Sequence, residues 1–203
     1  MKYMMRWIIL FFLLFAACST KPDVPQSGLT ESTLSYPNTR FLVASDLHFY
    51  DTSLGTEGKA FQKYLDEDRK LLVLSEEIIG TAMAKMAVEE ADFVLIPGDL
   101  TKDGERICHQ GIARHLKALT DAGKKVFVVP GNHDISNPDS VRFVGDKTEP
   151  EPSIGPAAFK QIFKEFGYGQ AIAQDPDSLS YVAEPVPGLL LLALDSNRYK
   201  ENR

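Results

Sequence analysis

The chain has 203 residues, of which 44% are hydrophobic and 25% are charged, and its formal net charge is −6. These values are ordinary for a globular protein and supply enough apolar residues for one domain with a sizeable core. The acidic balance, without a long basic run, argues against a nucleic-acid-binding protein, so we expect no nucleic-acid partner.

The N-terminal segment has the pattern of an export signal. Lys2 and Arg6 precede an apolar run at residues 7–15, and two alanines then lead to Cys18. This pattern resembles a bacterial lipoprotein signal, which implies that residues 1–17 are removed and that Cys18 carries lipid. A generic signal peptide and a short membrane anchor are the alternatives, although the run is short for a membrane-spanning helix.

The chain after the signal divides into a tether and a domain. Residues 18–38 contain Pro, Ser and Thr without periodicity, which predicts a flexible tether. Residues 39–203 would then be a domain held by lipid at a membrane of the bacterial cell envelope. The second cysteine, Cys108, would lack an intramolecular partner, and its apolar neighbours predict a small buried residue with no catalytic role.

Strand and helix patterns alternate through the first part of the domain. Short apolar runs that end in polar or Pro-Gly turns predict strands at residues 41–45, 92–96 and 125–129. Between them, residues 57–90 form a long helix-rich segment that Gly80 could interrupt. Residues 105–121 predict a second amphipathic helix, on which His109 and His115 are expected at the surface. Lys102, near the start of this helix, is expected to be a surface charge.

The last part of the chain has weaker patterns. Residues 136–154 are Pro-rich and charged, which predicts an irregular surface loop, and residues 156–167 predict a short helix. Residues 178–183 and 189–194 predict two adjacent strands that form a hairpin. The whole pattern predicts an α/β sandwich with a mainly parallel first sheet.

Three polar turns directly follow the first three predicted strands. They are Asp46-Leu47-His48, Gly98-Asp99 and Gly131-Asn132-His133-Asp134. Each turn alone is weak evidence, because such residues also cap loops, end strands and form Asx-type turns. Together they lie at one end of the predicted sheet, where buried strands fix their positions and loops present oxygen and imidazole ligands. This arrangement indicates a hydrolytic metal centre.

With these turns, the chain from about residue 40 to residue 197 resembles the calcineurin-like metallophosphoesterase family. Residues 97–105 and 178–181 resemble bacterial secreted or lipoprotein members in particular. The resemblance implies a four-layer αββα sandwich with a two-metal site between its sheets. It also implies a role for each turn residue: Asp46 and His48 bind the first metal, Asp99 bridges both, Asn132 binds the second, His133 approaches the leaving group, and Asp134 holds the His133 imidazole.

The chemistry of phosphoester hydrolysis explains these residue types. Two divalent cations can hold a bridging hydroxide and clamp the oxygens of an in-line phosphoryl displacement. Mixed Asp, His and Asn ligands suit Mn, Fe or Zn better than calcium. A positioned imidazolium can protonate the leaving alkoxide. We therefore expect a metal-dependent phosphomonoesterase or phosphodiesterase whose partner is a small-molecule phosphoester.

The sequence departs from the family pattern after His133. The pattern continues with a lone His and a Gly-His-X-His turn, whereas no histidine follows His133 here. We therefore expect a domain that lacks its C-terminal strands and ligands, in which the second metal keeps only Asp99 and Asn132. The alternatives are a lipid-anchored binding or structural lipoprotein, an inactive remnant of the fold, and an unrelated single-metal hydrolase.

Overall fold

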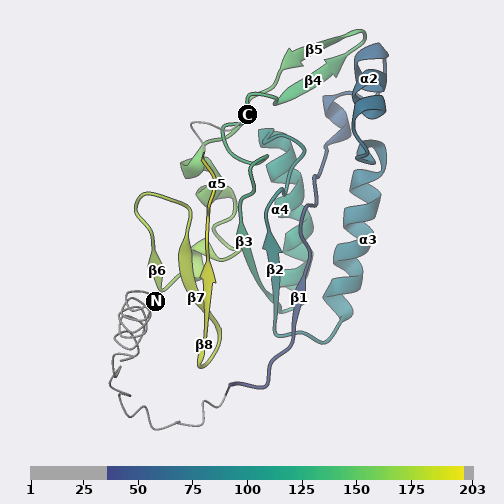
Figure 1. Ribbon diagram of the computed structural model, residues 1–203. Coiled ribbons are helices and arrows are strands. Elements are labelled where there is room, and N and C mark those ends of the chain that lie inside the picture. Colours follow the sequence, from purple (N-terminus) through teal and green to yellow (C-terminus); the bar gives the residue numbers. More distant parts are fainter. Residues whose placement is uncertain (1–35, 199–203) are drawn as a thin grey trace, which may run out of the picture. The chain divides into compact units, whose positions relative to one another are not determined.

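The structure is a computed structural model that describes residues 36–198 (Figure 1). The predicted signal and tether, including Cys18, lie outside the described residues except for the last three tether positions. The described part is a mixed α/β fold with two three-stranded sheets and a separate two-stranded hairpin. Within it, no helix is long and apolar enough to span a membrane.

The first sheet is parallel and has the strand order β1-β2-β3. It consists of β1 (Phe41–Val43), β2 (Phe93–Pro97) and β3 (Lys125–Val129), in agreement with the three predicted strands. The central strand β2 is largely buried, and its Val94 and Ile96 are fully enclosed. Because the strands are parallel, their carboxyl ends lie at one edge of the sheet, and the three polar turns begin there.

Helices fill the connections between these strands. They are η1 (Thr52–Leu54), α2 (Lys59–Glu67), η2 (Leu72–Leu74), α3 (Ser75–Val88) and α4 (Arg106–Asp121). The predicted helical segment breaks after α2 and continues through Gly80, which faces His115 of α4. The break follows from Asp68, whose extended backbone ends α2 and whose side chain accepts a hydrogen bond from the Lys70 amide. Cys108 is buried on α4, as predicted.

The predicted irregular loop at residues 136–154 is wrong in its centre, which forms an antiparallel hairpin. Its strands are β4 (Val141–Val144) and β5 (Lys147–Pro150). Gly145, with φ 60°, supplies the positive φ that a two-residue turn needs at its first position. The hairpin packs on α2 through Phe143, whose ring centroid lies 5.1 Å from that of Phe61. Phe143 is the one buried residue of β4, and a single buried residue gives no alternating hydrophobic pattern in the sequence. The hairpin was therefore not predicted.

The C-terminal part forms the second sheet, in which β6-β7-β8 are antiparallel. Its elements are α5 (Pro156–Ile162), η3 (Tyr168–Gln170), β6 (Ala173–Gln174), β7 (Tyr181–Val186) and β8 (Leu189–Ala193). The predicted hairpin is confirmed as β7–β8. The Tyr181 hydroxyl donates a 2.8 Å hydrogen bond to the Val128 carbonyl, and this bond joins the second sheet to β3.

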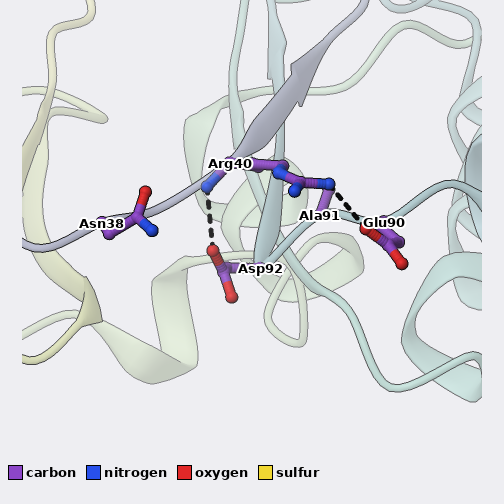
Figure 2. A pocket seen from close by; sticks show the side chains of 5 residues that line it. All are labelled: Asn38, Arg40, Glu90, Ala91 and Asp92. Atoms are coloured by element: carbon purple, nitrogen blue, oxygen red, sulfur yellow. Dashed lines mark hydrogen bonds and ion pairs between the residues drawn. The ribbon is translucent and has the colours of Figure 1, made fainter.

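The amino ends of β1 and β2 are fastened by charged side chains around a cavity of about 230 Å³ (Figure 2). The Asp92 carboxylate accepts hydrogen bonds from the Arg40 amide at 2.9 Å and from the Thr39 hydroxyl at 2.7 Å. The Arg40 guanidinium also pairs with Glu90 at 2.6 Å. This cavity lies at the end of the sheet opposite the polar turns. The hydrogen bonds and the ion pair around it connect the segment before β1 to the segment before β2.

Candidate metal centre

The first two polar turns are joined to each other by backbone hydrogen bonds. Beyond the ends of β1 and β2, the His48 amide donates to the Asp99 carbonyl at 2.8 Å, and the Phe49 amide donates to the Leu100 carbonyl at 2.9 Å. The Lys102 amide then donates to the Phe49 carbonyl at 3.0 Å. The strand pairing therefore continues into the turns, and it fixes the spacing of the side chains that the turns carry.

Three of the predicted ligands have an unusual backbone conformation. Asp46, His48 and Asp99 have φ values of 55°, 43° and 43°, in the left-handed region that favours glycine. Among the described residues, Ser136 is the other non-glycine residue with positive φ. Such conformations cost about 1–3 kcal/mol each and concentrate at functional sites. The turns are therefore held in shapes that aim these side chains.

His48, Asp99 and His133 come together at the carboxyl edge of the sheet. Each offers one possible ligand atom, and these atoms lie within 4.8 Å of one another. His48 Nε2 is 3.8 Å from Asp99 Oδ2, and the His48 and His133 rings are perpendicular with centroids 4.9 Å apart. Two ligand atoms that each lie about 2.1 Å from a cation are separated by about 3–4 Å, so the spacing fits a bound metal ion.

The environment of His48 also fits a metal ligand. Its Nδ1 atom is buried and makes no well-aligned hydrogen bond within residues 36–198, although the Thr101 backbone lies nearby. The other nitrogen, Nε2, faces Asp99 at 3.8 Å from its Oδ2 atom. Burial, together with the positive charge of Lys70, lowers the pKa of His48 and keeps the ring in the neutral form that binds metals.

The third turn orients the Asp99 carboxylate. Asp99 Oδ1 accepts a 3.1 Å hydrogen bond from the His133 amide, which leaves Oδ2 toward His48. Gly131 allows this close approach, because a Cβ atom at that position would overlap both Oδ1 and the backbone nitrogen of Asp99. The φ of Gly131 is not positive, so glycine is required here because of the space that the Asp99 carboxylate occupies and not because of the backbone conformation.

Asp46 and Asn132 lie on the same turns but outside the compact group of three ligands. Both are exposed. The Asp46 amide donates to the Gly98 carbonyl at 3.3 Å, and the Asp46 side chain lines a cavity of about 210 Å³ that it shares with His48. The roles of Asp46 and Asn132 as metal ligands remain predictions.

The prediction that Asp134 holds the His133 imidazole is wrong. The Asp134 side chain is fully buried beneath the turns, where it accepts hydrogen bonds from the backbone amides of Leu100, Thr101 and Gly131 and from the Thr101 hydroxyl. Burial raises its pKa, and the donated hydrogen bonds act in the opposite direction. Asp134 therefore ties the second turn to the third and makes no contact that holds the His133 ring.

Asp103 takes the place that was predicted for Asp134. Its Oδ1 atom is 2.8 Å from His133 Nδ1, and its Oδ2 atom contacts the Lys102 ammonium. The hydrogen bond to Asp103 raises the pKa of His133. Although burial alone would raise the pKa of Asp103, the contacts with His133 and Lys102 lower it. The sequence signal was a second acid in the turn after β2, four residues beyond Asp99.

Lys102 is buried, so the prediction of a surface charge is wrong. Its ammonium contacts Asp103, lies 3.3 Å from Glu105 Oε1, and sits 4.8 Å from the centre of the Tyr64 ring. Burial alone would lower the pKa of Lys102, but the charges of Glu105 and Asp103 outweigh it and raise the pKa. Lys102 therefore supports Asp103 from the side opposite His133.

His109 is also buried, in contrast to its predicted surface position. Its Nε2 atom lies 2.9 Å from the Asp134 carbonyl oxygen, so Nε2 carries the hydrogen and donates it. The ring packs against Phe159 and Phe163. Burial lowers the pKa of His109 to about 3. His115 is half-buried, with its Nε2 atom 3.2 Å from Glu76 Oε1.

A cavity of about 440 Å³ opens beside His133. Its walls come from the turn after β2, from α2 and from the β4–β5 hairpin, and include Tyr64, Lys70, Asp103, Val141 and Phe143. This volume is in the range of small-molecule sites. The cavity places apolar and charged side chains next to the His133 imidazole.

A comparison with protein families matches residues 39–186 to the family described as calcineurin-like phosphoesterase. The matched range contains all three polar turns and the walls of the cavity beside His133. A comparison with curated proteins finds no match.

Proposed function

The chain belongs to the calcineurin-like phosphoesterase family, and from this premise we propose that it hydrolyses a small-molecule phosphomonoester or phosphodiester. The observation that carries the proposal is the group of His48, Asp99 and His133 at the carboxyl edge of the parallel sheet. Family membership implies divalent metal ions, and an imidazole together with carboxylate and amide oxygens suits Mn, Fe or Zn. We assign the two-metal site to His48, Asp99, Asp46 and Asn132.

Bound divalent ions supply positive charge for the phosphoryl oxygens. Asp99 would hold the ions through its carboxylate, which the third turn fixes with one oxygen toward His48. The buried Asp134 holds the two turns at a set separation, which keeps Asp99 in place. The protein thus contributes a fixed ligand geometry.

His133 is the proton donor of the proposed reaction. Its Nδ1 atom is engaged by Asp103, so the proton available for a leaving oxygen is on Nε2. The hydrogen bond with Asp103 raises the pKa of His133 and so acts against the positive charge of nearby metal ions. The cavity beside His133 is then the place for the leaving group, whose oxygen takes the Nε2 proton.

Two further assignments belong to this proposal. The two three-stranded sheets would be part of the four-layer αββα sandwich of the family, a view supported by the hydrogen bond between Tyr181 and Val128. Cys18 would anchor the exported domain to a membrane of the cell envelope, as the N-terminal pattern indicates. Loss of membrane association in Cys18→Ser would test the second assignment.

The proposed activity is tested with the full chain loaded with Mn²⁺, Fe²⁺ or Zn²⁺. Metal content and hydrolysis of p-nitrophenyl phosphate and bis(p-nitrophenyl) phosphate are measured for the wild type, Asp99→Ala and His133→Ala. We expect Asp99→Ala to lose bound metal and turnover. His133→Ala should lower kcat by about 10²–10⁴-fold and keep its metal.

Three results would contradict these assignments. A folded, metal-loaded wild type that hydrolyses neither ester would refute the activity. Unchanged kcat in His133→Ala would refute its role as the acid. Loss of metal in His133→Ala would make His133 a ligand instead.

A further inference from the structure

We propose that Lys70 binds the phosphoryl group of the substrate and positions it at the metal centre. This inference rests on the proposed phosphoester hydrolysis, and it names a residue that lies on none of the three polar turns. Lys70 belongs to the connection between α2 and η2, where the helical segment is interrupted.

Lys70 lies between the two cavities that flank the candidate metal centre. It lines the cavity of about 440 Å³ together with His133, and it also lines the cavity of about 210 Å³ together with His48. Its side chain is 18% exposed, so the ammonium is largely shielded from bulk water. A ligand that contacts both imidazoles would therefore be within reach of Lys70.

The Lys70 side chain is oriented by its neighbours. Its Nζ atom is 3.1 Å from Asp68 Oδ2, which also accepts a 3.0 Å hydrogen bond from the Tyr64 hydroxyl. The other oxygen of Asp68 accepts a 3.2 Å hydrogen bond from the Lys70 backbone amide. An ammonium has three N–H donors, and the Asp68 contact uses one, so donors remain for phosphate oxygens.

The charge of Lys70 is unfavourable for a site that binds only cations. Lys70 lines the cavity beside His133 and the cavity beside His48, so its positive charge lies near both imidazoles. The same charge would repel a metal ion held there. A bound phosphate reverses this balance, because an anion between Lys70 and the metal centre is attracted by both.

The other lysines that line the larger cavity differ from Lys70. Lys102 contacts two buried carboxylates, Asp103 and Glu105. Lys63 has a 75% exposed side chain and pairs with Glu67 on the outer part of α2. Neither lines the second cavity. Lys63 is therefore a matched control for Lys70, because it lines the larger cavity but not the cavity beside His48.

The test measures phosphate binding and kinetics separately. Inorganic phosphate is titrated calorimetrically into the Mn²⁺-loaded full chain, for the wild type, Lys70→Gln, Lys70→Arg, Asp68→Asn and Lys63→Gln. A charge-assisted hydrogen bond of about 1.5–3 kcal/mol corresponds to a loss of about 10–100-fold in phosphate affinity in Lys70→Gln. KM for p-nitrophenyl phosphate should rise by a similar factor, with unchanged metal content.

The accompanying variants separate binding from folding. Lys70→Arg keeps the charge and should recover most of the affinity, and Lys63→Gln should bind phosphate as the wild type does. Asp68→Asn keeps the ammonium but removes its orienting partner, so it should weaken phosphate binding by a smaller factor than Lys70→Gln. A purely structural ion pair would instead lower the melting temperature in both variants and leave phosphate affinity unchanged, which would overturn the inference.

The outcomes distinguish this inference from the proposed function. Hydrolysis by the wild type with equal KM and phosphate affinity in Lys70→Gln would refute the role of Lys70 and keep the activity. A wild type without hydrolysis that binds phosphate through Lys70 would refute the activity and keep the site. A loaded wild type that binds no phosphate would overturn the inference.

Discussion

Asp103 Oδ1 lies 2.8 Å from His133 Nδ1, although thirty residues separate the two in the sequence. Asp134, the residue next to His133, is buried and accepts backbone hydrogen bonds. Two acids close to one histidine thus have different tasks. One orients the imidazole, and the other holds the turns that carry it.

Substitution of the two acids should therefore separate activity from stability. Asp103→Asn should lower kcat by about 10²–10⁴-fold, because the His133 ring loses the acceptor that fixes its tautomer. Asp134→Asn should cost about 3 kcal/mol of unfolding free energy, because an amide cannot accept all the donors that now meet the carboxylate. Steady-state kinetics and urea unfolding measure the two effects. Equal stability of Asp134→Asn and the wild type would refute the structural role of Asp134.

Gly131→Ala should disturb the metal centre through Asp99. The added Cβ would overlap the Asp99 carboxylate, so that carboxylate must move away from His48. We expect a loss of about 10–100-fold in Mn²⁺ affinity, as for other changes that misorient a ligand. Gly155→Ala is the control, because its Cβ would meet open space at a φ of −93°. Equal metal affinities for the two variants would contradict the constraint at Gly131.

His109 should make the fold sensitive to acid. Its pKa is about 3 in the fold and 6.5 when unperturbed, so between these pH values the unfolded chain binds a proton that the folded chain does not. Stability should therefore fall as pH drops below 6.5, with a share from His109 of about 1.4 kcal/mol per pH unit.

The pH dependence is checked with His109→Gln, which keeps an N–H donor for the Asp134 carbonyl but does not titrate. Unfolding free energies of the wild type and this variant are compared between pH 7 and pH 4. The variant should lose less stability over this range. Parallel curves would mean that His109 does not contribute.

Lys102→Met should be strongly destabilising, because it leaves the buried carboxylates of Asp103 and Glu105 without their cation. Breaking a buried ion pair on one side costs about 3–5 kcal/mol. The double variant Lys102→Met/Glu105→Gln should recover part of this loss in denaturant unfolding. Lys117→Met, at an ion pair on the exposed face of α4, should change stability by less than about 1 kcal/mol. A similar small change at Lys102 would refute the buried-pair account.

The sequence predicted those parts of the fold that depend on local periodicity. The strands β1, β2 and β3, the helix α4 and the β7–β8 hairpin each have an apolar pattern in the sequence. The structure buries most of that pattern in β2, β3 and α4 and leaves β1 and β8 partly exposed. The break after α2 was missed, because it depends on the hydrogen bonds of one side chain, Asp68. The β4–β5 hairpin was missed, because its burial depends on Phe143 packing against a distant helix.

The candidate site was predicted in part for the same reason. The positions of His48, Asp99 and His133 follow from where the strands end, and the structure brings these three together. The direction of a side chain within a turn depends on backbone conformation, such as the φ of 80° at Gly104, which sequence spacing does not specify. The burial of Lys102 and His109 depends on aromatic rings from other elements, such as Tyr64 for Lys102 and Phe159 for His109, so their positions along the sequence alone were misleading.

The backbone bonds that run from His48 to Asp99 and from Phe49 to Leu100 have a kinetic consequence. They make the two turns one cooperative unit with the sheet. The conformational entropy that is lost when the metal ligands are brought together is therefore lost during folding, before the metal binds. Loading should then proceed in a single phase, limited by loss of water from the ion. The ligands should separate when the sheet itself opens, so release of metal on heating should coincide with global unfolding.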